Sequence, residues 1–438
     1  MRGTNIKSVV ARQVFSGRGQ PAIEATVTTE NGKSGTVQVV AGLSVGTHEV
    51  AFAFDGETAW RGKGVSRAVH HIQNIIAPAI IGMDSTHQFE VDHTMLTLGG
   101  ENAKERLGGN AIAAVSAAVL KAGAEALGIP LYRHIGGATA VTLPCAAYGC
   151  ISGGIRYGDG KKSGSKPTYS FIGHGFGTFS EASYALYEVF VRWEERMNRL
   201  YGLRSQEPSP YYTCCGFFSI PRGVVKCDRE LWDALTETIC QCGYEGRIGL
   251  QGDFAADCYY DPQKQVYCGL FNEEPRTRER QMEMMLWLAR EYPFVIMEDP
   301  LAEDDFEGHA YLTRESGIQI VGDDLFTTNP ERVRRGIEEG ACNTVLLKVN
   351  QIGSISESLE MIQLAYENGY GVMPCSSRGE GLDICDYSVG INAGSIRESS
   401  LGTPGTRFLE IEAELGNRAR YAGAAGLKGK KFREEALK

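Results

Sequence analysis

Hydrophobic and polar residues alternate along the first part of the chain, which is the pattern of half-buried β-strands. The alternation covers residues 8–15, 22–29 and 35–40, with glycine-containing turns between the three stretches. Residues 64–82 and 109–127 are predicted to be helices. The second of these is small and apolar nearly all round, so we expect it to be buried. Together these elements predict an N-terminal α+β unit.

From about Leu143 the pattern changes to short apolar runs that alternate with amphipathic helices. The predicted helices cover, in chain order, residues 277–291, 331–339 and 354–367. Asn329 is a predicted N-cap, and Pro330 suits the first helical position after it. Strands that alternate with helices indicate a parallel sheet. We therefore predict a modified (β/α)8 barrel of the TIM type over residues 141–438, preceded by a smaller α+β domain over residues 1–140.

Four polar residues each come directly after an apolar run in the second half of the chain. They are Asp253, Glu298, Asp323 and Lys348, and the last three are spaced 25 residues apart. That spacing accommodates one strand, one helix and two short loops, so these residues are expected at successive strand ends, where such barrels keep their chemistry. Three carboxylates offer oxygen ligands to a hard divalent cation, and a lysine beside them is a candidate base. The alternative role of Lys348 is a structural ion pair with Asp323.

Composition narrows the functional classes. The chain has 438 residues and a net charge of −10, from 44 basic and 54 acidic residues, without a long basic run. Nucleic acid and anionic membranes are therefore not expected partners. We find no 18-residue apolar span and no signal-peptide pattern, which favours a cytoplasmic enzyme. None of the 12 cysteines forms a CxxC pair, so zinc fingers and thioredoxin-type motifs are not expected and buried free thiols are.

Several segments match the motifs of one known family, in the family's own order and over nearly the full length. The most specific is Leu346-Leu-Lys-Val-Asn-Gln-Ile-Gly. The others are residues 11–24, 62–65, 109–112, 130–135, 297–300 and 321–325. In these motifs the chain resembles the enolase family (phosphopyruvate hydratase). The resemblance implies a small N-terminal α+β domain on a modified (β/α)8 barrel, with Mg²⁺ at the carboxyl end of the barrel strands. It also implies a homodimer or a larger homo-oligomer.

The resemblance assigns roles to the strand-end residues. Asp253, Glu298 and Asp323 match the ligands of the first Mg²⁺, and Ser44 matches the serine that contributes to a second. Lys348 matches the base that removes the proton next to the carboxylate of a small anionic substrate. Losing that proton places two negative charges on one small group, which Mg²⁺ can neutralise. A partly buried lysine beside a dication is expected to have a lowered pKa.

Other positions depart from the family pattern, and the departures gather around the mouth of the site. Cys215 stands where the family has the glutamate that acts as acid, and residues 169–171 (Tyr-Ser-Phe) replace the family's Gln-Glu-Phe. Arg156 stands at a family histidine. Cys215 is open to two interpretations, a replacement acid or a buried inert thiol. The polar, glycine-rich residues 155–168 are a candidate lid.

The anion-binding positions are changed as well. Arg397 replaces the family's second active-site lysine, and Arg378 is displaced from the family's phosphate-site arginine, with Ser377 beside it. Arg397 is a candidate catalytic residue that anchors a substrate anion or forms a salt bridge, because arginine stays protonated. Arg378, Ser377 and Arg156 are candidate substrate-binding residues.

These patterns predict a Mg²⁺-dependent lyase of the enolase family that removes the α-proton of a small carboxylate through an ene-diolate. Because the acid and substrate-shaping positions differ, we expect turnover of 2-phosphoglycerate to be weak or absent. Two alternatives stay open. One is an enolase-like protein that has lost catalysis and works by binding, and the other is an acid-sugar dehydratase on the same barrel.

Overall fold

The computed structural model describes most of the chain. The described residues are 3–17, 19–42, 45–56, 58–98, 100, 102–152, 166–203, 215–221, 223–268 and 274–435. Of residues 215–217 and 433–435 the backbone alone is described.

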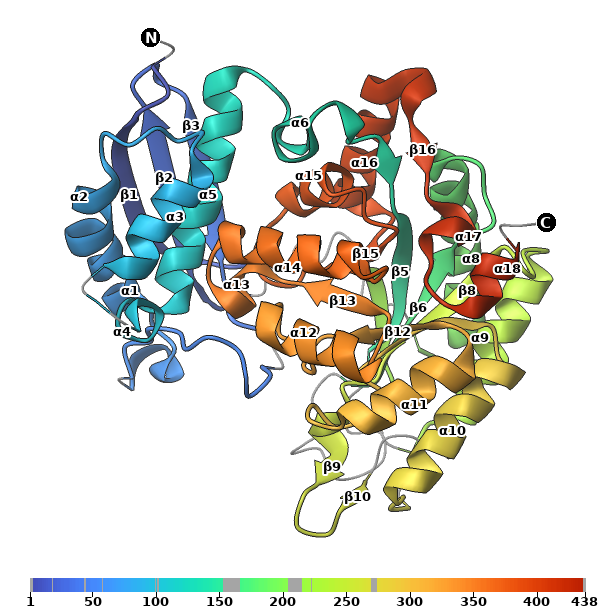
Figure 1. The fold of residues 1–438 in the computed structure, drawn as a ribbon. Coiled ribbons are helices and arrows are strands. Elements are labelled where there is room, and N and C mark those ends of the chain that lie inside the picture. Colours follow the sequence, from blue (N-terminus) through green and yellow to red (C-terminus); the bar gives the residue numbers. More distant parts are fainter. Residues whose placement is uncertain are drawn as a thin grey trace.

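The N-terminal part is an antiparallel three-stranded sheet covered by helices (Figure 1). Its strands β1 (Ile6–Phe15), β2 (Pro21–Thr29) and β3 (Ser34–Val39) follow one another in space as in sequence. Helix α5 (Gly109–Leu127) packs against β2 and β3, and most of its residues are buried. The three predicted strands and the predicted buried helix are confirmed.

Helix α5 also corrects one expectation from the sequence. By length and composition it could cross a membrane, so the chain does contain an apolar span of that size. However, 78% of the span is buried inside the fold, as in the core helix of a globular domain.

The predicted helix over residues 64–82 is present as three consecutive pieces. These are α1 (Ser66–His71), a π-helical turn η2 (Ile72–Ile76) and α2 (Ala77–Ile80). Further elements of this part are η1 (Ala59–Gly62), α3 (Gln88–Thr97), α4 (Ala103–Leu107), α6 (Leu131–Gly136) and η3 (Gly137–Thr139).

The second part is built around a nine-stranded sheet. Its strands are β5 (Cys145–Ser152), β6 (Thr168–Gly173), β7 (Cys215–Ser219), β8 (Ile248–Asp253), β11 (Phe294–Glu298), β12 (Gln319–Gly322), β13 (Thr344–Leu347), β14 (Gly371–Pro374) and β15 (Ser395–Ser399). All neighbouring pairs are parallel except those of β6, which runs antiparallel to β5 and β8. A parallel bridge between Cys375 and Arg397 joins the β14 and β15 ends of the sheet, so the strands close into a modified barrel.

Helices cover the outside of this barrel (Figure 1). They are α8 (Phe179–Tyr201), α9 (Arg229–Gln241), α10 (Arg278–Glu291), α11 (Phe306–Ser316), α12 (Pro330–Glu339), α13 (Val349–Ile352), α14 (Ile355–Glu367), α15 (Asp383–Gly390), α16 (Gly402–Leu415), α17 (Gly423–Gly426) and α18 (Lys430–Glu435). The remaining short elements are β4 (Thr142–Leu143), η4 (Ala256–Tyr259), β9 (Tyr260–Asp261), β10 (Val266–Tyr267), η5 (Gly416–Arg418) and β16 (Arg420–Tyr421).

Local capping signals set the helix starts that the sequence predicts. The side chain of Asn329 accepts a hydrogen bond from the amide of Glu331 at 2.9 Å, and Pro330 is the first residue of α12. Ser354 caps α14 in the same way through the amide of Glu357. The predicted barrel fold is confirmed, whereas the division of the chain at residue 140 stays a prediction.

Candidate functional site

The four polar residues picked out by their spacing lie at the ends of neighbouring parallel strands. Asp253 and Glu298 are the last residues of β8 and β11, and the two strands pair these residues directly. Asp323 follows β12, and Lys348 follows β13. All four side chains are buried. Because parallel strands end at one edge of the barrel, charges far apart in sequence converge there.

Asp323 and Lys348 form a buried ion pair, in which the Lys348 ammonium contacts Oδ2 of Asp323. Gln351 donates to the other carboxylate oxygen at 2.8 Å. Burial alone would raise the pKa of Asp323, but the Lys348 ammonium lowers it below its usual value. Burial likewise lowers the pKa of Lys348, but Asp323 outweighs it, and the pKa is raised. This raised pKa describes the ion pair with Asp323 alone, and the lowering expected for Lys348 beside a dication stays a prediction.

Arg397, at the end strand β15, connects two of the carboxylates. Its Nη2 contacts Oδ2 of Asp253, and its Nε lies 3.5 Å from Oε2 of Glu298. It also donates to the hydroxyl of Thr168 at 3.3 Å. Burial raises the pKa of Glu298 even though Arg397 counteracts it. The residue that replaces the family's second lysine thus keeps a fixed positive charge among the strand-end carboxylates.

Lys166 is a site residue that the sequence did not single out. Its ammonium contacts the same Asp253 oxygen as Arg397 does, and its side chain is buried. Burial, reinforced by the charge of Arg397, lowers the pKa of Lys166 to about 8. In the sequence it belongs to the polar residues 155–168, the candidate lid. The available signal was its place two residues before strand β6, whose neighbour β8 carries Asp253.

Some oxygens of the strand-end carboxylates lack a hydrogen bond from the described residues. Oδ1 of Asp253 and Oε2 of Glu298 are buried and accept no hydrogen bond from any described residue. One oxygen each of Glu298, Asp299 and Asp323 lie within 4.8 Å of one another, all buried. Asp299, however, uses both oxygens to accept the amides of Asp323 and Asp324, at 3.0 and 2.8 Å. The group of converging oxygens therefore includes Glu298 and Asp323 but not Asp253, and the assignment of Asp253, Glu298 and Asp323 as Mg²⁺ ligands stays a prediction.

Backbone strain is concentrated at the same edge of the barrel. Asp299 and Glu398, which follow Glu298 and Arg397, have φ values of +41° and +65°. Ala255, two residues after Asp253, has a φ of +40°. Non-glycine residues adopt this left-handed region at a cost, and such positions gather at functional sites. These three strained residues thus lie next to the strand ends that carry Asp253, Glu298 and Arg397.

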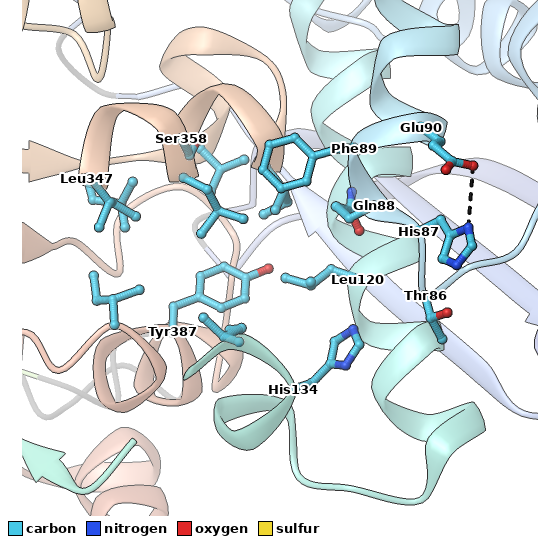
Figure 2. A pocket seen from close by; sticks show the side chains of 16 residues that line it. Thr86, His87, Gln88, Phe89, Glu90, Leu120, His134, Leu347, Ser358 and Tyr387 are labelled. Atoms are coloured by element: carbon cyan, nitrogen blue, oxygen red, sulfur yellow. Dashed lines mark hydrogen bonds and ion pairs between the residues drawn. The ribbon is translucent and has the colours of Figure 1, made fainter. Parts of the chain in front are cut away.

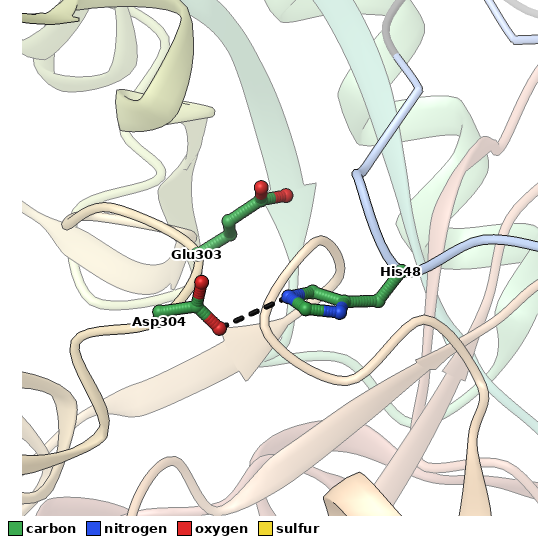
Figure 3. A group of neighbouring side chains, drawn as sticks. All are labelled: His48, Glu303 and Asp304. Atoms are coloured by element: carbon green, nitrogen blue, oxygen red, sulfur yellow. Dashed lines mark hydrogen bonds and ion pairs between the residues drawn. The ribbon is translucent and has the colours of Figure 1, made fainter. Parts of the chain in front are cut away.

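The loop that precedes residue 50 passes over this edge and is anchored to it. The amide of Thr47 donates to Glu303 at 3.0 Å, and His48 Nε2 lies 3.0 Å from Oδ1 of Asp304 (Figure 3). A Cβ added to Gly46 would lie 3.0 Å from Oδ1 of Asp324, so the loop backbone runs close to the carboxylates. Ser44, the predicted ligand of a second Mg²⁺, lies outside the described residues.

The candidate substrate-binding residues Arg378 and Ser377 have different surroundings in the structure. The Arg378 guanidinium forms two hydrogen bonds to Glu49, at 2.8 and 2.5 Å, and both side chains are almost fully buried. Ser377 accepts a hydrogen bond from Cys375 Sγ at 3.3 Å. Arg156 lies outside the described residues, as does most of the candidate lid, and only the backbone of Cys215 is described. Their roles stay predictions.

Buried free thiols are the state that the sequence predicts for the cysteines. The ten cysteines that the structure describes with side chains are all free, and five of them are buried. Burial raises the pKa of Cys145 to about 12, which keeps this thiol protonated and inert.

Comparison with known proteins adds to this geometry. Residues 6–135 match the family model described as "Enolase, N-terminal domain", and residues 175–430 match "Enolase, C-terminal TIM barrel domain". The chain is 40% identical over 427 residues to an enolase of Methanopyrus kandleri, which covers 95% of this chain and 97% of that protein. It is 39% identical over 430 residues to an enolase of Methanocaldococcus jannaschii, with the same coverage. An enolase of Thermococcus kodakarensis is 38% identical over 443 residues, 99% of each chain.

Proposed function

The chain belongs to the enolase family and is a lyase of the enolase type, and on that basis we propose that it removes the α-proton of a small hydroxy carboxylate with the help of Mg²⁺. The observation that carries the proposal is the strand-end cluster. It combines three buried carboxylates, two of which have an oxygen that accepts no hydrogen bond from a described residue, with a lysine in contact with the third.

Lys348 is the proposed base. Its ammonium contacts Asp323, so the carboxylate both orients the side chain and holds its proton while the site is at rest. When bound at Asp253, Glu298 and Asp323, Mg²⁺ would compete with the ammonium for Asp323 and offset the second negative charge that forms on the substrate carboxylate. Neutral Lys348 can then accept the substrate proton at Nζ.

Arg397 is proposed to orient the substrate rather than to donate a proton. Arginine stays protonated at any pH where the protein is folded, so it supplies a fixed charge and no acid. Its contacts to Asp253 and Glu298 keep that charge at the mouth of the barrel. Arg378, Ser377, Arg156 and Ser44 remain proposed substrate or metal contacts.

The changed positions argue for a substrate other than 2-phosphoglycerate. The proposed phosphate-site arginine is engaged with Glu49, and Lys166 adds a buried cation beside Asp253. Both contacts affect which anions the mouth of the site can accept. We further propose a cytoplasmic homodimer or larger homo-oligomer, as the family resemblance implies.

The test is a turnover assay on the purified full-length chain. The panel contains 2-phosphoglycerate, unphosphorylated hydroxy acids and acid sugars, each with Mg²⁺ and with EDTA. We expect Mg²⁺-dependent dehydration of at least one small carboxylate, and slow or no turnover of 2-phosphoglycerate.

Three results would change the assignment. Turnover of 2-phosphoglycerate at roughly 10 per second or more, a usual enzyme rate, would mean that the altered positions do not change the substrate. Turnover of acid sugars alone would favour the dehydratase. Binding of Mg²⁺ without turnover of any compound would favour a protein that only binds.

A further inference from the structure

A second cavity lies between the N-terminal helices and the barrel. It has a volume of about 360 Å³ and is bounded by α3, α5, α6, α14, α15 and the end of β13 (Figure 2). Its lining is mainly apolar and includes Leu120, Ile135, Leu347, Val349, Ile355 and Ile362. Small-molecule sites in proteins have volumes of about 300–1,000 Å³ and apolar walls with a few polar groups. The cavity therefore has the size and the surface of such a site.

Polar contacts beside the cavity fix the positions of the helices that surround it. On one side, Asp92 of α3 accepts hydrogen bonds from the amide and hydroxyl of Ser356, at 2.9 and 2.7 Å, which ties α3 to the start of α14. On the other side, Lys121 of α5 contacts both oxygens of Asp383 at 2.7 and 2.8 Å, which ties α5 to α15. Because these buried or half-buried contacts fix the helices, the space between them is preformed.

Two polar groups at this cavity have no hydrogen-bond partner among the described residues. Tyr387 is only 4% exposed, its hydroxyl points toward the cavity centre, and no described residue hydrogen-bonds to it (Figure 2). Gln88 directs its NH₂ group to Asp92 and to the carbonyl of Ser116, at 3.0 and 3.1 Å. Both of those groups are acceptors, so the amide orientation is set, and Oε1 of Gln88 has no partner. Buried polar groups normally find one.

The described lining of this cavity does not suit the anionic substrate that is proposed for the barrel mouth. No lysine or arginine is among the described residues that line the cavity. At the rim, the exposed His87 is 3.4 Å from Glu90. Burial lowers the pKa of His134, so this ring is neutral at pH 7. A carboxylate or phosphate would find no cation here to offset its desolvation.

We propose that this cavity is a second ligand site, which takes a neutral, mainly apolar small molecule carrying one hydrogen-bonding group for the Tyr387 hydroxyl. An engineered apolar cavity of roughly 150 Å³ holds benzene, so this volume admits two fused rings. The inference stands apart from the proposed activity. Its occupant would nevertheless touch Leu347 and Val349, the chain neighbours of Lys348.

The test compares two probes of similar shape, 1-indanone with a carbonyl acceptor and indane without one. Binding to the full-length protein is followed by NMR titration. We expect saturable binding of both and a tighter complex with 1-indanone. In Tyr387→Phe the affinity for 1-indanone should fall about five- to tenfold, the effect of one net hydrogen bond, and the affinity for indane should not change. The removed hydroxyl has no described protein partner, so the variant is expected to fold.

A second pair of variants locates the site. Leu359→Trp places a large ring from α14 into the cavity and should abolish binding of both probes, whereas Glu360→Trp adds the same ring to the exposed face of the helix and should leave it intact. Lys348→Ala should also leave probe affinity unchanged, which separates this site from the barrel mouth. The proposal is overturned if neither probe saturates, if Tyr387→Phe affects both probes equally, or if folded Leu359→Trp still binds them.

Discussion

Lys348 lies between two regions of different character, a cluster of buried charges and an apolar cavity. Its side chain enters the strand-end cluster, where buried ion pairs such as the one with Asp323 join the residues. Its chain neighbours Leu347 and Val349 line an apolar cavity that is held open by polar contacts at its edges. Successive residues at a strand end face opposite sides, so one short segment serves both regions.

The two regions should therefore respond differently to substitution. In the charged cluster, each group stabilises or destabilises the charge of its neighbours, so removing one changes the protonation and pairing of the others. In the cavity, the lining residues contribute through area and shape, and their effects should stay local. The following substitutions test this difference.

The largest effect is expected for Lys348→Ala. If Lys348 is the base, kcat for the accepted substrate should fall by about 10²–10⁴-fold. The substitution also leaves Asp323 buried without its ammonium partner, so thermal stability should fall as well. The control is Lys104→Ala, which removes a half-buried lysine paired with Glu357 outside the barrel mouth. An equal loss of kcat in both variants would contradict the role of Lys348.

Arg378→Met tests the buried pair that fixes the loop over the cluster. Removing the guanidinium leaves Glu49 buried and charged, and we expect the free energy of unfolding to fall by about 3–5 kcal/mol. Urea unfolding measures this change. The double variant Glu49→Gln with Arg378→Met should recover part of the loss, because the unpaired charge is gone. A loss of equal size in the double variant would point to packing rather than charge.

Lys166→Met should change how stability depends on pH. Burial and Arg397 lower the pKa of Lys166 from 10.5 to about 8. Between these values the native protein binds fewer protons than the unfolded chain, so the free energy of unfolding rises as pH rises. This one group can contribute at most about 1.4 kcal/mol per pH unit. Urea unfolding in EDTA from pH 7.5 to 10 should show a smaller rise for Lys166→Met than for Lys264→Met, which alters an exposed lysine.

The smallest effect is expected for His48→Ala. His48 and Asp304 are 35% and 64% exposed, and such pairs contribute about 0.2–1 kcal/mol. A double-mutant cycle with Asp304→Asn isolates the coupling energy. A coupling above this range would show that the anchor of the loop resembles the buried cluster more than an ordinary surface pair.

Much of the fold could be predicted because its signals are local. Alternation over residues 22–29 and the apolar run before Lys348 each predicted a strand that the structure contains. The cap at Asn329 predicted a helix start because a side chain and an amide two residues away suffice to form it. The spacing of the apolar runs then predicted where the strands end, and therefore where the carboxylates lie.

The partners of those residues could not be predicted in the same way. Lys166 contacts Asp253 across 87 positions of sequence, and Arg378 contacts Glu49 across 329. No local pattern encodes such pairs, because they depend on where loops and strands pass one another after closure. The shift in the pKa of Lys348 could not be predicted either, because whether the pKa is raised or lowered depends on the contact with Asp323 rather than on residue type.

By itself, the sequence determined the order of strands and helices and the four charged strand ends, because periodicity and capping act over a few residues. Only the tertiary structure decided which charges meet, that Lys166 joins the cluster, and that Tyr387 and Gln88 come together at an apolar cavity beside it. The physical reason is that ion pairing and cavity shape are set by packing between segments that are distant in the chain, once the barrel has closed against the N-terminal helices.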